Sequence, residues 1–565
     1  MNAWKQIMAA GLVGLLTGAT GFGDATNRYV AFNSTNPQYP YDSWSIAATN
    51  IIDAMTVANA NNAQDIVYVS NGIYCVTNYI FISNAILQSM STSRADTIIN
   101  GNNYPAKPVT NRCCYLNHAN AVVNGFTITN GFADNGGGVY LTKGTVRNCN
   151  IVGNTATQAG GGVYVTSAGT LTNCIVNWNL CSNSAYAITY GGGGVCIYQR
   201  VGAAVRNCEI NSNNNVNTNY GGGVMIYGNG TVRDCSIQGN YVSRGGGGIA
   251  LTTAGALFAS NCVIRGNSAG MMGGGVYLNG CGTGGGRVSD CTIDVNNATD
   301  SGGGAYLYNP TSGNFERTTV SSNTALDGGG IYIRYFDTTI EFGDYCTIVG
   351  NRASRNGGGL YLSRTQNGMS NCQVIGNSAG TNGGGVYCEQ SGSGFPSSRL
   401  MNFLIANNVA GNQGGGFYAN RIGKNGGAIM SSTIVSNYAN RGGGIALVSS
   451  NNPVVNTVVY SNAAVVTNAD LYDVAGNNAD ALSYCCTSST NGYTGSGNTT
   501  AYPKFADAPA GNWRLGAYSP CINAGTNQDW MDSATDLDGR PRRRYNQVDI
   551  GAYEHIYSGT LFMSR

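Results

Sequence analysis

The chain has 565 residues, a formal net charge of +2, only 10% charged residues and 84 glycines. So weak a charge excludes the basic surface with which proteins hold nucleic acid, and we expect no nucleic-acid partner. The low charge does not predict disorder, because apolar residues are plentiful and recur with a regular period. With only His118 and His555 in the sequence, a histidine-based metal site or catalytic triad is not expected.

The N-terminus resembles a secretory signal in its pattern. Lys5 precedes an apolar stretch, residues 7–16, that is too short to span a bilayer, and small residues at 23 and 25 suit signal cleavage. We therefore predict a signal peptide over residues 1–25 and a mature protein that is secreted or held at the cell surface. No later segment has the roughly 18 apolar residues of a membrane helix, so we expect no transmembrane segment in the mature chain.

Residues 26–125 are predicted to form an N-terminal cap and the first irregular coils. Strand-like runs occur at 66–69, 79–82 and 122–128. An open solenoid end exposes unpaired backbone groups and needs a cover. The segment 45–60 predicts that cover, an amphipathic helix whose apolar face holds Ile46, Ile51, Ile52, Met55 and Val57.

Residues 126–470 carry a repeat opened by a glycine triplet. The intervals run from 24 residues (Gly138 to Gly162) to 32 (Gly162 to Gly194), a period typical of a solenoid in which each repeat stacks on the next. The last glycines of the twelve triplets are Gly138, Gly162, Gly194, Gly223, Gly248, Gly275, Gly304, Gly330, Gly359, Gly385, Gly416 and Gly444.

One repeat, residues 136–154, predicts the shape of a coil. Val139 and Leu141 flank Tyr140, which indicates a strand with the aliphatic residues inside and tyrosine outside. A second strand holds Val146, a bend follows at Asn148, and a third short strand, 149–151, ends in a turn at 154. We therefore predict an all-β fold, a single-stranded parallel β-helix with three strands and three turns per coil, which is right-handed by the general preference of parallel crossovers.

Two polar positions recur in the repeats. The bend is Asn or Asp in eight of them, which suits a left-handed corner: Asn148, Asn173, Asn207, Asp234, Asn261, Asp290, Asn371 and Asn456. An asparagine further on is predicted to form an internal amide ladder along the axis, with a row of ligand contacts as the alternative: Asn154, Asn179, Asn213, Asn240, Asn267, Asn296, Asn323, Asn351, Asn377, Asn407, Asn437 and Asn462.

The 18 cysteines of an exported chain would ordinarily indicate disulfides. Their positions favour a stacked column of buried thiols instead, because eight share one inward site of the repeat: Cys149, Cys174, Cys208, Cys235, Cys262, Cys291, Cys346 and Cys372. Other repeats are expected to place Thr318, Asn402, Ser432 and Thr457 there. Better disulfide candidates, with a connectivity that the sequence leaves open, are Cys113, Cys114, Cys485, Cys486 and Cys521.

Residues 471–565 are predicted to form an irregular C-terminal cap. Charge is dense here, in the segment DLDGRPRRR and around VDIGAYE. Asp529 together with Asp532, Asp536 and Asp538 offers oxygen ligands for calcium, the one cofactor that we consider. The alternative is an Asp–Arg network that closes the cap, and in that case no cofactor is expected.

Two surfaces are candidate sites. Acidic residues gather once within the repeats, at Asp337, Glu341 and Asp344, with Arg334 nearby; they are either solvated loop charges or the acids and base of a polysaccharide lyase or hydrolase. An outward, exposed tyrosine column could stack on sugar rings or on a partner protein, or only on itself: Tyr140, Tyr164, Tyr277, Tyr306, Tyr332, Tyr361, Tyr387 and Tyr418.

The triplet followed by V-Y, with the later C-x-I-x-x-N, resembles the repeats of polymorphic outer-membrane proteins. The tail DLDGRPRRRYNQVDIGAYE and the opening YPYDSWSIAATNIIDAM are similar to choice-of-anchor Q proteins. The resemblance implies a right-handed β-helix of the pectin-lyase-like superfamily, exported to the surface or medium. That group has no single established activity, and no autotransporter barrel follows the repeats.

These observations favour a non-enzymatic, adhesin-like or carbohydrate-contacting scaffold. The first alternative is a polysaccharide lyase or glycoside hydrolase acting on an acidic or plant or algal glycan, with its site around residues 334–364. The second is a purely structural coat protein. A polysaccharide or a cell-surface component is the expected partner, and we expect the chain to be a monomer.

Overall fold

The structure is a computed structural model of the whole chain. It describes residues 25–61, 63–101, 111–182, 191–216, 220–252, 257–280, 286–309, 313–336, 343–365, 369–389, 399–420, 428–448, 453–467, 469–473, 481–489, 493–544 and 546–557. The predicted signal peptide, apart from its last residue, lies outside the described residues. Among the described residues, no helix has the length and apolar character needed to cross a membrane.

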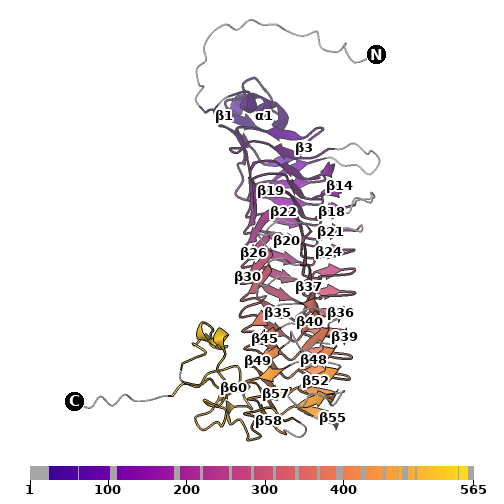
Figure 1. The fold of residues 1–565 in the computed structure, drawn as a ribbon. Coiled ribbons are helices and arrows are strands. Elements are labelled where there is room, and N and C mark those ends of the chain that lie inside the picture. The colour runs from indigo at the N-terminus through magenta and orange to yellow at the C-terminus, as the bar shows by residue number, and fades with distance from the viewer. Residues whose placement is uncertain are drawn as a thin grey trace, which may run out of the picture.

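The described chain is almost entirely β, arranged as parallel sheets that run the length of a solenoid (Figure 1). The largest sheet has 24 strands: β1 (Asn27–Val30), β2 (Asp65–Val69), β4 (Ile80–Ile82), β5 (Ala85–Ser89), β7 (Cys114–Leu116), β8 (Val122–Asn124), β11 (Val139–Leu141), β12 (Gly144–Arg147), β15 (Val163–Val165), β16 (Gly169–Thr172), β19 (Val195–Arg206), β22 (Val224–Arg233), β25 (Ile249–Leu251), β26 (Leu257–Ser260), β29 (Val276–Asn279), β30 (Gly286–Ser289), β33 (Ala305–Tyr308), β34 (Gly313–Glu316), β37 (Ile331–Phe336), β40 (Leu360–Thr365), β44 (Val386–Glu389), β48 (Phe417–Asn420), β52 (Ile445–Val448) and β56 (Leu471–Asp473). A five-stranded sheet continues its second strand in the late coils: β41 (Met369–Ser370), β45 (Arg399–Met401), β49 (Ala428–Met430), β53 (Val454–Val455) and β57 (Leu482–Ser483).

The third strand of each coil belongs to a sheet of 16: β3 (Gly72–Cys75), β6 (Thr97–Asn100), β9 (Thr127–Thr129), β13 (Asn150–Val152), β17 (Ile175–Asn177), β20 (Glu209–Asn211), β23 (Ser236–Gln238), β27 (Val263–Arg265), β31 (Thr292–Asp294), β35 (Thr319–Ser321), β38 (Thr347–Val349), β42 (Gln373–Ile375), β46 (Leu404–Ala406), β50 (Thr433–Val435), β54 (Val458–Tyr460) and β58 (Cys486–Thr487). The fourth belongs to a sheet of 13: β10 (Phe132–Asn135), β14 (Thr155–Ala159), β18 (Leu180–Cys181), β21 (Asn214–Asn215), β24 (Tyr241–Val242), β28 (Ser268–Ala269), β32 (Asn297–Ala298), β36 (Thr324–Asp327), β39 (Arg352–Asn356), β43 (Ser378–Ala379), β47 (Val409–Ala410), β51 (Tyr438–Arg441) and β55 (Ala463–Thr467). A short antiparallel pair, β59 (Phe505–Asp507) and β60 (Asn512–Leu515), and the helices η1 (Trp44–Ile46), α1 (Ile51–Ala60) and η2 (Asp529–Asp532) complete the described elements.

The prediction of a parallel β-solenoid is confirmed, but the strand count per coil was too low. Each of the twelve repeats has a fourth strand that follows the ladder asparagine, such as Ser268–Ala269 in β28. The sequence did not reveal it because most of these strands have two residues and one buried alanine or similar side chain, which is too short to show alternation. The inward residues of the other strands behave as predicted: Val139, Val146 and Ile151 are fully buried and lie over their counterparts in the next coil.

The asparagine ladder is confirmed, with one correction. Each amide donates to the side-chain oxygen of the next asparagine at about 3 Å, as from Asn240 to Asn267 (2.9 Å) and from Asn267 to Asn296 (3.0 Å), and that oxygen also accepts a backbone N–H. The last amide, that of Asn462, donates to Asp470 instead (2.9 Å). The member that follows Asn377 is Asn408, whereas the predicted Asn407 is an exposed turn residue with φ of 57°. Buried amides that are satisfied in this way hold the coils in one register.

The misassigned asparagine follows from a one-residue error in the same coil. Phe403, not Asn402, occupies the inward cysteine site, and Asn402 (φ 58°) is the corner residue. Counting five residues from Phe403 gives Asn408. The eight predicted Asn and Asp corners all have φ between 51° and 55°, so that prediction is confirmed.

Each glycine of the triplet is required for a different reason, shown by the coil that begins at Gly383. Gly383 has φ of +66°, and a Cβ there would lie 2.7 Å from the Cβ of Tyr387. A Cβ on Gly384 would lie 2.5 Å from the carbonyl oxygen of Gly415 in the next coil. A Cβ on Gly385 would lie 3.0 Å from the amide of Asn408. Because glycine has no Cβ, the triplet allows the tyrosine side chain, the backbone of the next coil and the ladder asparagine to pack closely against one corner.

The cysteine column is confirmed as a stack of buried side chains. All eight predicted members are buried free thiols, and Thr318, Ser432 and Thr457 take the same inward site in other coils. Cys485 continues the column, with its thiol 3.1 Å from the carbonyl oxygen of Val454. Such a site favours cysteine because it is small, apolar and next to a sharp corner.

The helix α1 is shorter than predicted and begins at Ile51. Asn50 accepts a hydrogen bond from the backbone N–H of Asp53 (2.9 Å) and so fixes the start of the helix, while the predicted residues 45–50 form η1 and an extended link. Of the predicted apolar face, Ile51 and Met55 are buried and Ile52 and Val57 are half-buried; Ala54 and Ala58 complete the buried side. The helix lies at the N-terminal end of the solenoid and contacts β1, β2, β4 and β5 (Figure 1).

The C-terminal segment folds back along the last coils instead of lying beyond them (Figure 1, yellow). The backbone N–H of Ala552 donates to Oγ1 of Thr433 (3.0 Å), and the amide of Asn402 donates to the carbonyl of Thr535 (2.6 Å). Apolar residues on the outer face of the 16-stranded sheet pack against this segment. They form one buried cluster with it: Leu404, Ala406, Val435, Val458, Cys486, Trp513, Leu515, Cys521, Leu537, Ile550, Ala552 and Tyr553.

Candidate functional site

The predicted tyrosines form a stack on the outer side of the first strand of successive coils. Parallel pairing places Tyr277 beside Tyr306, Tyr306 beside Tyr332, and so on to Tyr418. Ring centroids are 5.7 Å apart for Tyr277 and Tyr306 and 4.4 Å apart for Tyr332 and Tyr361. The column is interrupted at Cys196, Met225 and Ala250, where Tyr198 and Tyr227 continue the ring contacts.

The prediction that this column is exposed is wrong. Tyr164, Tyr277, Tyr306, Tyr361, Tyr387 and Tyr418 are at most 6% exposed, and only Tyr140 and Tyr332 are half-buried. The rings lie in the angle where the end of the 13-stranded sheet meets the first strand, against Ala159, Tyr220 and Met272. The first glycine of the triplet leaves the space that each ring occupies. The column is therefore a second apolar core outside the solenoid lumen.

Burial determines the chemistry of these phenols. Desolvation raises the pKa of Tyr332, Tyr361 and Tyr387 far above the usual range, and the nearby carboxylate of Glu389 raises the pKa of each further. The phenols are therefore neutral at physiological pH. They can donate or accept hydrogen bonds at their hydroxyl ends, but they are not phenolate bases.

A row of polar residues lies beside the tyrosines, two positions further along the same strands. Parallel pairing places Arg334 beside Ser363, Ser363 beside Glu389 and Glu389 beside Asn420. The carboxylate of Glu389 accepts hydrogen bonds from Oγ of Ser363 (3.3 Å) and from the hydroxyl of Tyr387 (3.4 Å). Arg334 is exposed, Glu389 and Asn420 are half-buried, and Ser363 is buried (6% exposed). We name Arg334, Ser363, Glu389 and Asn420 the polar row.

The opposite edge of the tyrosine column carries an ion pair. Asp327 is 4% exposed, and its carboxylate accepts from Nε (3.0 Å) and Nη2 of Arg355 in the next coil and from the backbone N–H of Asn356 (3.1 Å). Arg355 itself is exposed. The paired carboxylate is neutralised and oriented, so that Asp327 serves structure more than general acid or base chemistry.

The predicted acidic cluster is not assembled as one site in the described residues. Asp337 and Glu341 lie outside the described residues. Asp344 precedes the corner residue Tyr345, and its carboxylate accepts from the amide of Asn371 (2.9 Å). Arg334 lies instead in the polar row, near the hydroxyl of Tyr306. Two separate predictions, the arginine and the tyrosine column, thus meet on one surface.

The structure gives the predicted calcium ligands other partners. Asp532 pairs with Arg543 (2.6 Å), and Asp538 pairs with Arg514 and with Arg540 (3.1 Å). Asp536 is fully buried and accepts three backbone N–H groups, those of residues 538, 540 and 554. This is the Asp–Arg network that was the alternative. Within the described ranges, no three His, Cys, Asp or Glu side chains are grouped so that they could hold a metal ion.

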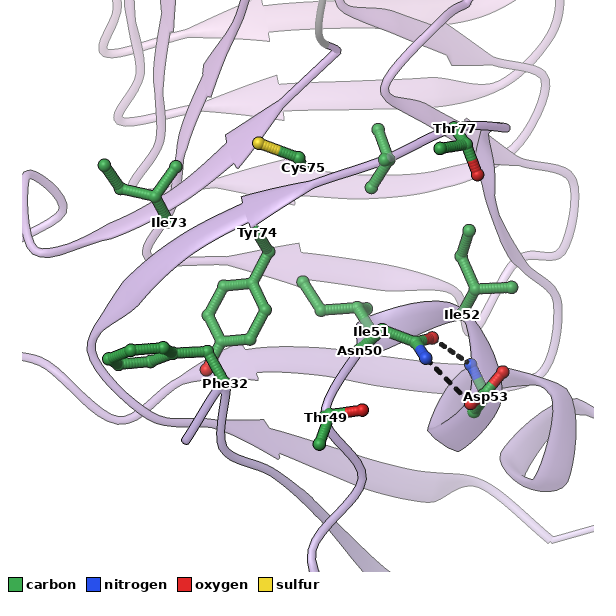
Figure 2. A pocket seen from close by; sticks show the side chains of 11 residues that line it. Phe32, Thr49, Asn50, Ile51, Ile52, Asp53, Ile73, Tyr74, Cys75 and Thr77 are labelled. Atoms are coloured by element: carbon green, nitrogen blue, oxygen red, sulfur yellow. Dashed lines mark hydrogen bonds between the residues drawn. The ribbon is translucent and has the colours of Figure 1, made fainter. Parts of the chain in front are cut away.

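A cavity of about 390 Å³ lies at the N-terminal end, between the start of α1 and β3. Figure 2 shows Phe32 and Tyr74 on one side and Thr49, Asn50 and Asp53 on the other, with two hydrogen bonds joining Asn50 to Asp53. These bonds cap the helix and occupy the side chains of Asn50 and Asp53. The cavity is far along the solenoid from the polar row and shares no residue with it.

Sequence reasoning missed Glu389, Ser363 and Asn420 as site residues. A signal for them exists: all stand four positions after the last glycine of their triplets, as Arg334 does. Alignment of the repeats on that glycine would have placed them in one row. The tyrosine, two positions earlier, drew attention instead because it is the more regular residue.

Comparison with known proteins agrees with the geometry of the coils. A family model described as "Right handed beta helix region" matches residues 170–341 and 247–399. The chain contains a right-handed β-helix. No curated protein sequence matches it significantly.

The chain also matches solved structures of differently named proteins. The mannuronan C-5 epimerase AlgE6 A-module of Azotobacter vinelandii is 13% identical over 67% of this chain and 92% of its own, with a TM-score of 0.32. The pectate lyase Pel9A is 15% identical over 95% of this chain and 98% of its own (TM-score 0.23). PfbA, a surface adhesin of Streptococcus pneumoniae, is 12% identical over 81% of this chain and 92% of its own (TM-score 0.24). Similarity this low does not carry an activity from any of them to this β-helix.

Proposed function

We propose that this β-helix is an exported scaffold, secreted or held at the cell surface, that contacts carbohydrate through the polar row. The observation that carries the proposal is the row itself: a cation, a hydroxyl, a carboxylate and an amide at the same register position of four successive coils. Export is the prediction from the N-terminal residues of the sequence. The proposal thereby assigns the adhesin-like contact to one surface of the solenoid, the polar row.

The spacing of the row suits an extended polar ligand. Neighbouring strands are roughly 4.8 Å apart, so that Arg334 and Glu389, two coils apart, are separated by roughly 10 Å along the axis. Between them, the buried hydroxyl groups of Ser363 and Tyr387 donate to Glu389 and orient its carboxylate. A linear glycan laid along the solenoid would meet Arg334, Glu389 and Asn420 in turn, with its hydroxyl groups as donors and acceptors for all three.

The geometry favours binding over hydrolysis. Glycoside hydrolysis needs two carboxyl groups on either side of the scissile bond. On the described part of this surface, the polar row contributes one carboxylate, Glu389, and the nearest buried one, Asp327, is paired with Arg355. A lyase is the second candidate, because Arg334 and Glu389 lie on the same side of the solenoid, two coils apart. A purely structural coat protein is the third.

Affinity electrophoresis of the purified mature chain on acidic and neutral polysaccharides tests the proposal. We expect retention on at least one glycan and at least about tenfold weaker binding for Arg334→Ala, because loss of a charged hydrogen-bond donor costs about 1.5–3 kcal/mol. Arg265→Ala is the matched control, since Arg265 is an exposed arginine on another sheet, paired with Asp294.

The same samples are assayed for new reducing ends and for the ultraviolet absorbance of unsaturated uronates, with and without calcium. Retention without product supports the scaffold. Product that disappears in Glu389→Gln favours the enzyme instead. Equal binding by Arg334→Ala and Arg265→Ala would show that the polar row does not bind the glycan. If the chain is retained on no glycan, the purely structural coat protein becomes the favoured function.

A further inference from the structure

Three exposed arginines stand in one row on the second strand of the early coils. Arg147 is in β12, Arg206 in β19 and Arg233 in β22, and each directly precedes a corner residue with a left-handed φ. Parallel pairing places Arg147 beside Thr172, Thr172 beside Arg206 and Arg206 beside Arg233. All three arginine side chains are exposed. We name Arg147, Arg206 and Arg233 the arginine row.

The arginine row differs from other outward arginines of the sheets because no carboxylate neutralises it. Arg265 pairs with Asp294 of the next coil (2.6 Å), and Arg287 pairs with Glu316 of the next coil. Within the part of the chain that the structure describes, the guanidinium groups of the arginine row have neither an ion pair nor a hydrogen bond. Their charges are therefore available to a ligand.

Two acidic residues close to the row in the chain have other positions. Asp234 follows Arg233 at the corner, where its carboxylate accepts from the amide of Asn261 (2.7 Å). Glu209 is in β20 and belongs to the 16-stranded sheet, beyond the corner from Arg206. Arg206 and Arg233 thus stand side by side on strands that are roughly 4.8 Å apart. Like charges placed in this way destabilise a sheet unless an anion lies between them.

The neighbouring outward positions suit a sugar chain. Two residues earlier on the same strands stand Thr170 and Thr231, which are half-buried, and Phe258, which is 46% exposed and pairs with Thr231. The ring of Phe258 can stack on the face of a sugar ring. The row itself follows the solenoid axis, with Arg147 two coils from Arg206, a separation of roughly 10 Å. A linear ligand that lies along the axis would meet all of these side chains.

The number of donors favours a phosphate or sulfate ester over a carboxylate. A carboxylate has two oxygens and is satisfied by one guanidinium in a bidentate pair, as Asp327 is by Arg355. A phosphate or sulfate monoester has three terminal oxygens on one tetrahedral centre, so that two guanidinium groups can donate to it together. Arg206 and Arg233 are neighbours of this kind, and each presents a planar fork of N–H groups.

We propose that the arginine row binds a linear anionic glycan that carries phosphate or sulfate ester groups. Arg206 and Arg233 share one ester, Arg147 contacts a second, and Phe258 stacks on a sugar ring of the same chain. The surface lies on β22 and β26, nearer the N-terminal end of the solenoid than β40 and β48 of the polar row (Figure 1). It is a different surface from the polar row, and the proposal does not depend on what the polar row binds.

Three derivatives of one polymer test the class of anion. Dextran sulfate, dextran phosphate and carboxymethyl dextran are matched in chain length and in charged groups per sugar, and uncharged dextran is the blank. We expect the purified mature chain to be retained more strongly by the sulfate and the phosphate than by the carboxymethyl polymer, with retention falling as ionic strength rises. Equal or stronger retention by carboxymethyl dextran, or retention by none of the polymers, would overturn the proposal.

Variants show which arginines hold the polymer. Replacing both Arg206 and Arg233 by alanine should weaken retention on dextran sulfate at least about tenfold, because two charged hydrogen-bond donors are lost. Arg287→Ala is the matched control on the same face, since this arginine is paired with Glu316; an equal loss in this variant would overturn the proposal. Arg334→Ala should leave this retention unchanged, so that a failure of the arginine row and a failure of the polar row are observed separately.

Urea unfolding without polymer distinguishes binding from a structural role. Because Arg206 and Arg233 repel each other, their joint replacement by alanine should leave the unfolding midpoint unchanged or raise it. A lower midpoint would assign the two arginines to stability and overturn the proposal. Arg147→Ala, two coils away, gives an independent measure that leaves the adjacent pair intact. Its retention on dextran sulfate should also fall, and unchanged retention would contradict the contact with a second ester.

Discussion

The adjacent residues Asn407 and Asn408 offer a sharp test of the ladder. Asn408 makes four side-chain hydrogen bonds in the interior. Its amide donates to the carbonyl of Val374 (2.9 Å) and to Oδ1 of Asn437 (2.9 Å), and its oxygen accepts from the backbone N–H (2.9 Å) and the amide of Asn377 (3.0 Å). Asn407 is exposed and has φ of 57°.

Asn408→Ala should destabilise the protein by about 4 kcal/mol. The change leaves three groups without partners and away from water: the carbonyl of Val374, the backbone N–H of Asn377 and one of its amide hydrogens. A buried unsatisfied group costs about 1–3 kcal/mol. Asn437 is affected less, because its oxygen still accepts from the backbone N–H of residue 408 (2.9 Å). Asn407→Gly is the control, since glycine keeps the left-handed backbone and should cost less than about 1 kcal/mol.

Urea unfolding followed by circular dichroism, with hydrogen exchange of residues 369–420, measures both variants. Hydrogen exchange is included because stacked coils can open locally without global unfolding. We expect a lower midpoint and faster exchange at residue 377 for Asn408→Ala only. If Asn407→Gly were the more damaging change, or if both were silent, the assignment of the ladder would be refuted.

Two further predictions concern the glycine corner and the C-terminal cap. Gly383→Ala should lower the free energy of unfolding, measured in urea, by about 2 kcal/mol more than Gly376→Ala does. Both glycines have a left-handed φ (66° and 63°), but only a Cβ at 383 would meet Tyr387, at 2.7 Å. Equal losses for the two variants would show that the steric clash with the tyrosine is unimportant. Burial raises the pKa of Glu554 to about 8, so that the folded state retains a proton that the unfolded chain has lost. Hydrogen exchange of the cap should therefore become faster as pH rises from about 5 to about 8, after correction for the intrinsic rate, and Glu554→Gln should remove this trend; an unchanged trend would contradict it.

The periodic features of the chain could be predicted from the sequence, because a solenoid repeats the same physical problem in every coil. Aliphatic residues, corner Asn and Asp residues and ladder amides recur since each coil must bury, turn and stack in the same way. The errors arose where one coil departs from the pattern, as when Phe403 takes the cysteine site and moves the ladder from Asn407 to Asn408. A single repeat read alone cannot show such a shift.

Contacts between segments that are far apart in the sequence could not be predicted from the repeats, because each repeat was compared only with other repeats. The fold-back of the C-terminal segment is one of them. Its trace in the sequence is the change of the outward residues of the third strand, from Thr319 and Ser321 in a mid-solenoid coil to Leu404 and Ala406 near the end. An apolar outer face predicts a cover, but only the structure shows that residues 500–555 supply it.

The candidate site follows from the same corner that defines the fold. The first glycine admits the tyrosine ring, the ring fills the angle between two sheets, and its burial turns a supposed binding face into a core. The next outward position, two residues along, is less constrained by the fold: Arg334 there is exposed, and Glu389 and Asn420 are half-buried. In most repeats it holds Tyr, Thr, Asn or Val, but in four successive coils it holds Arg334, Ser363, Glu389 and Asn420. A position that is free to vary and yet gathers charge beside a rigid aromatic stack is where we expect this β-helix to meet its ligand.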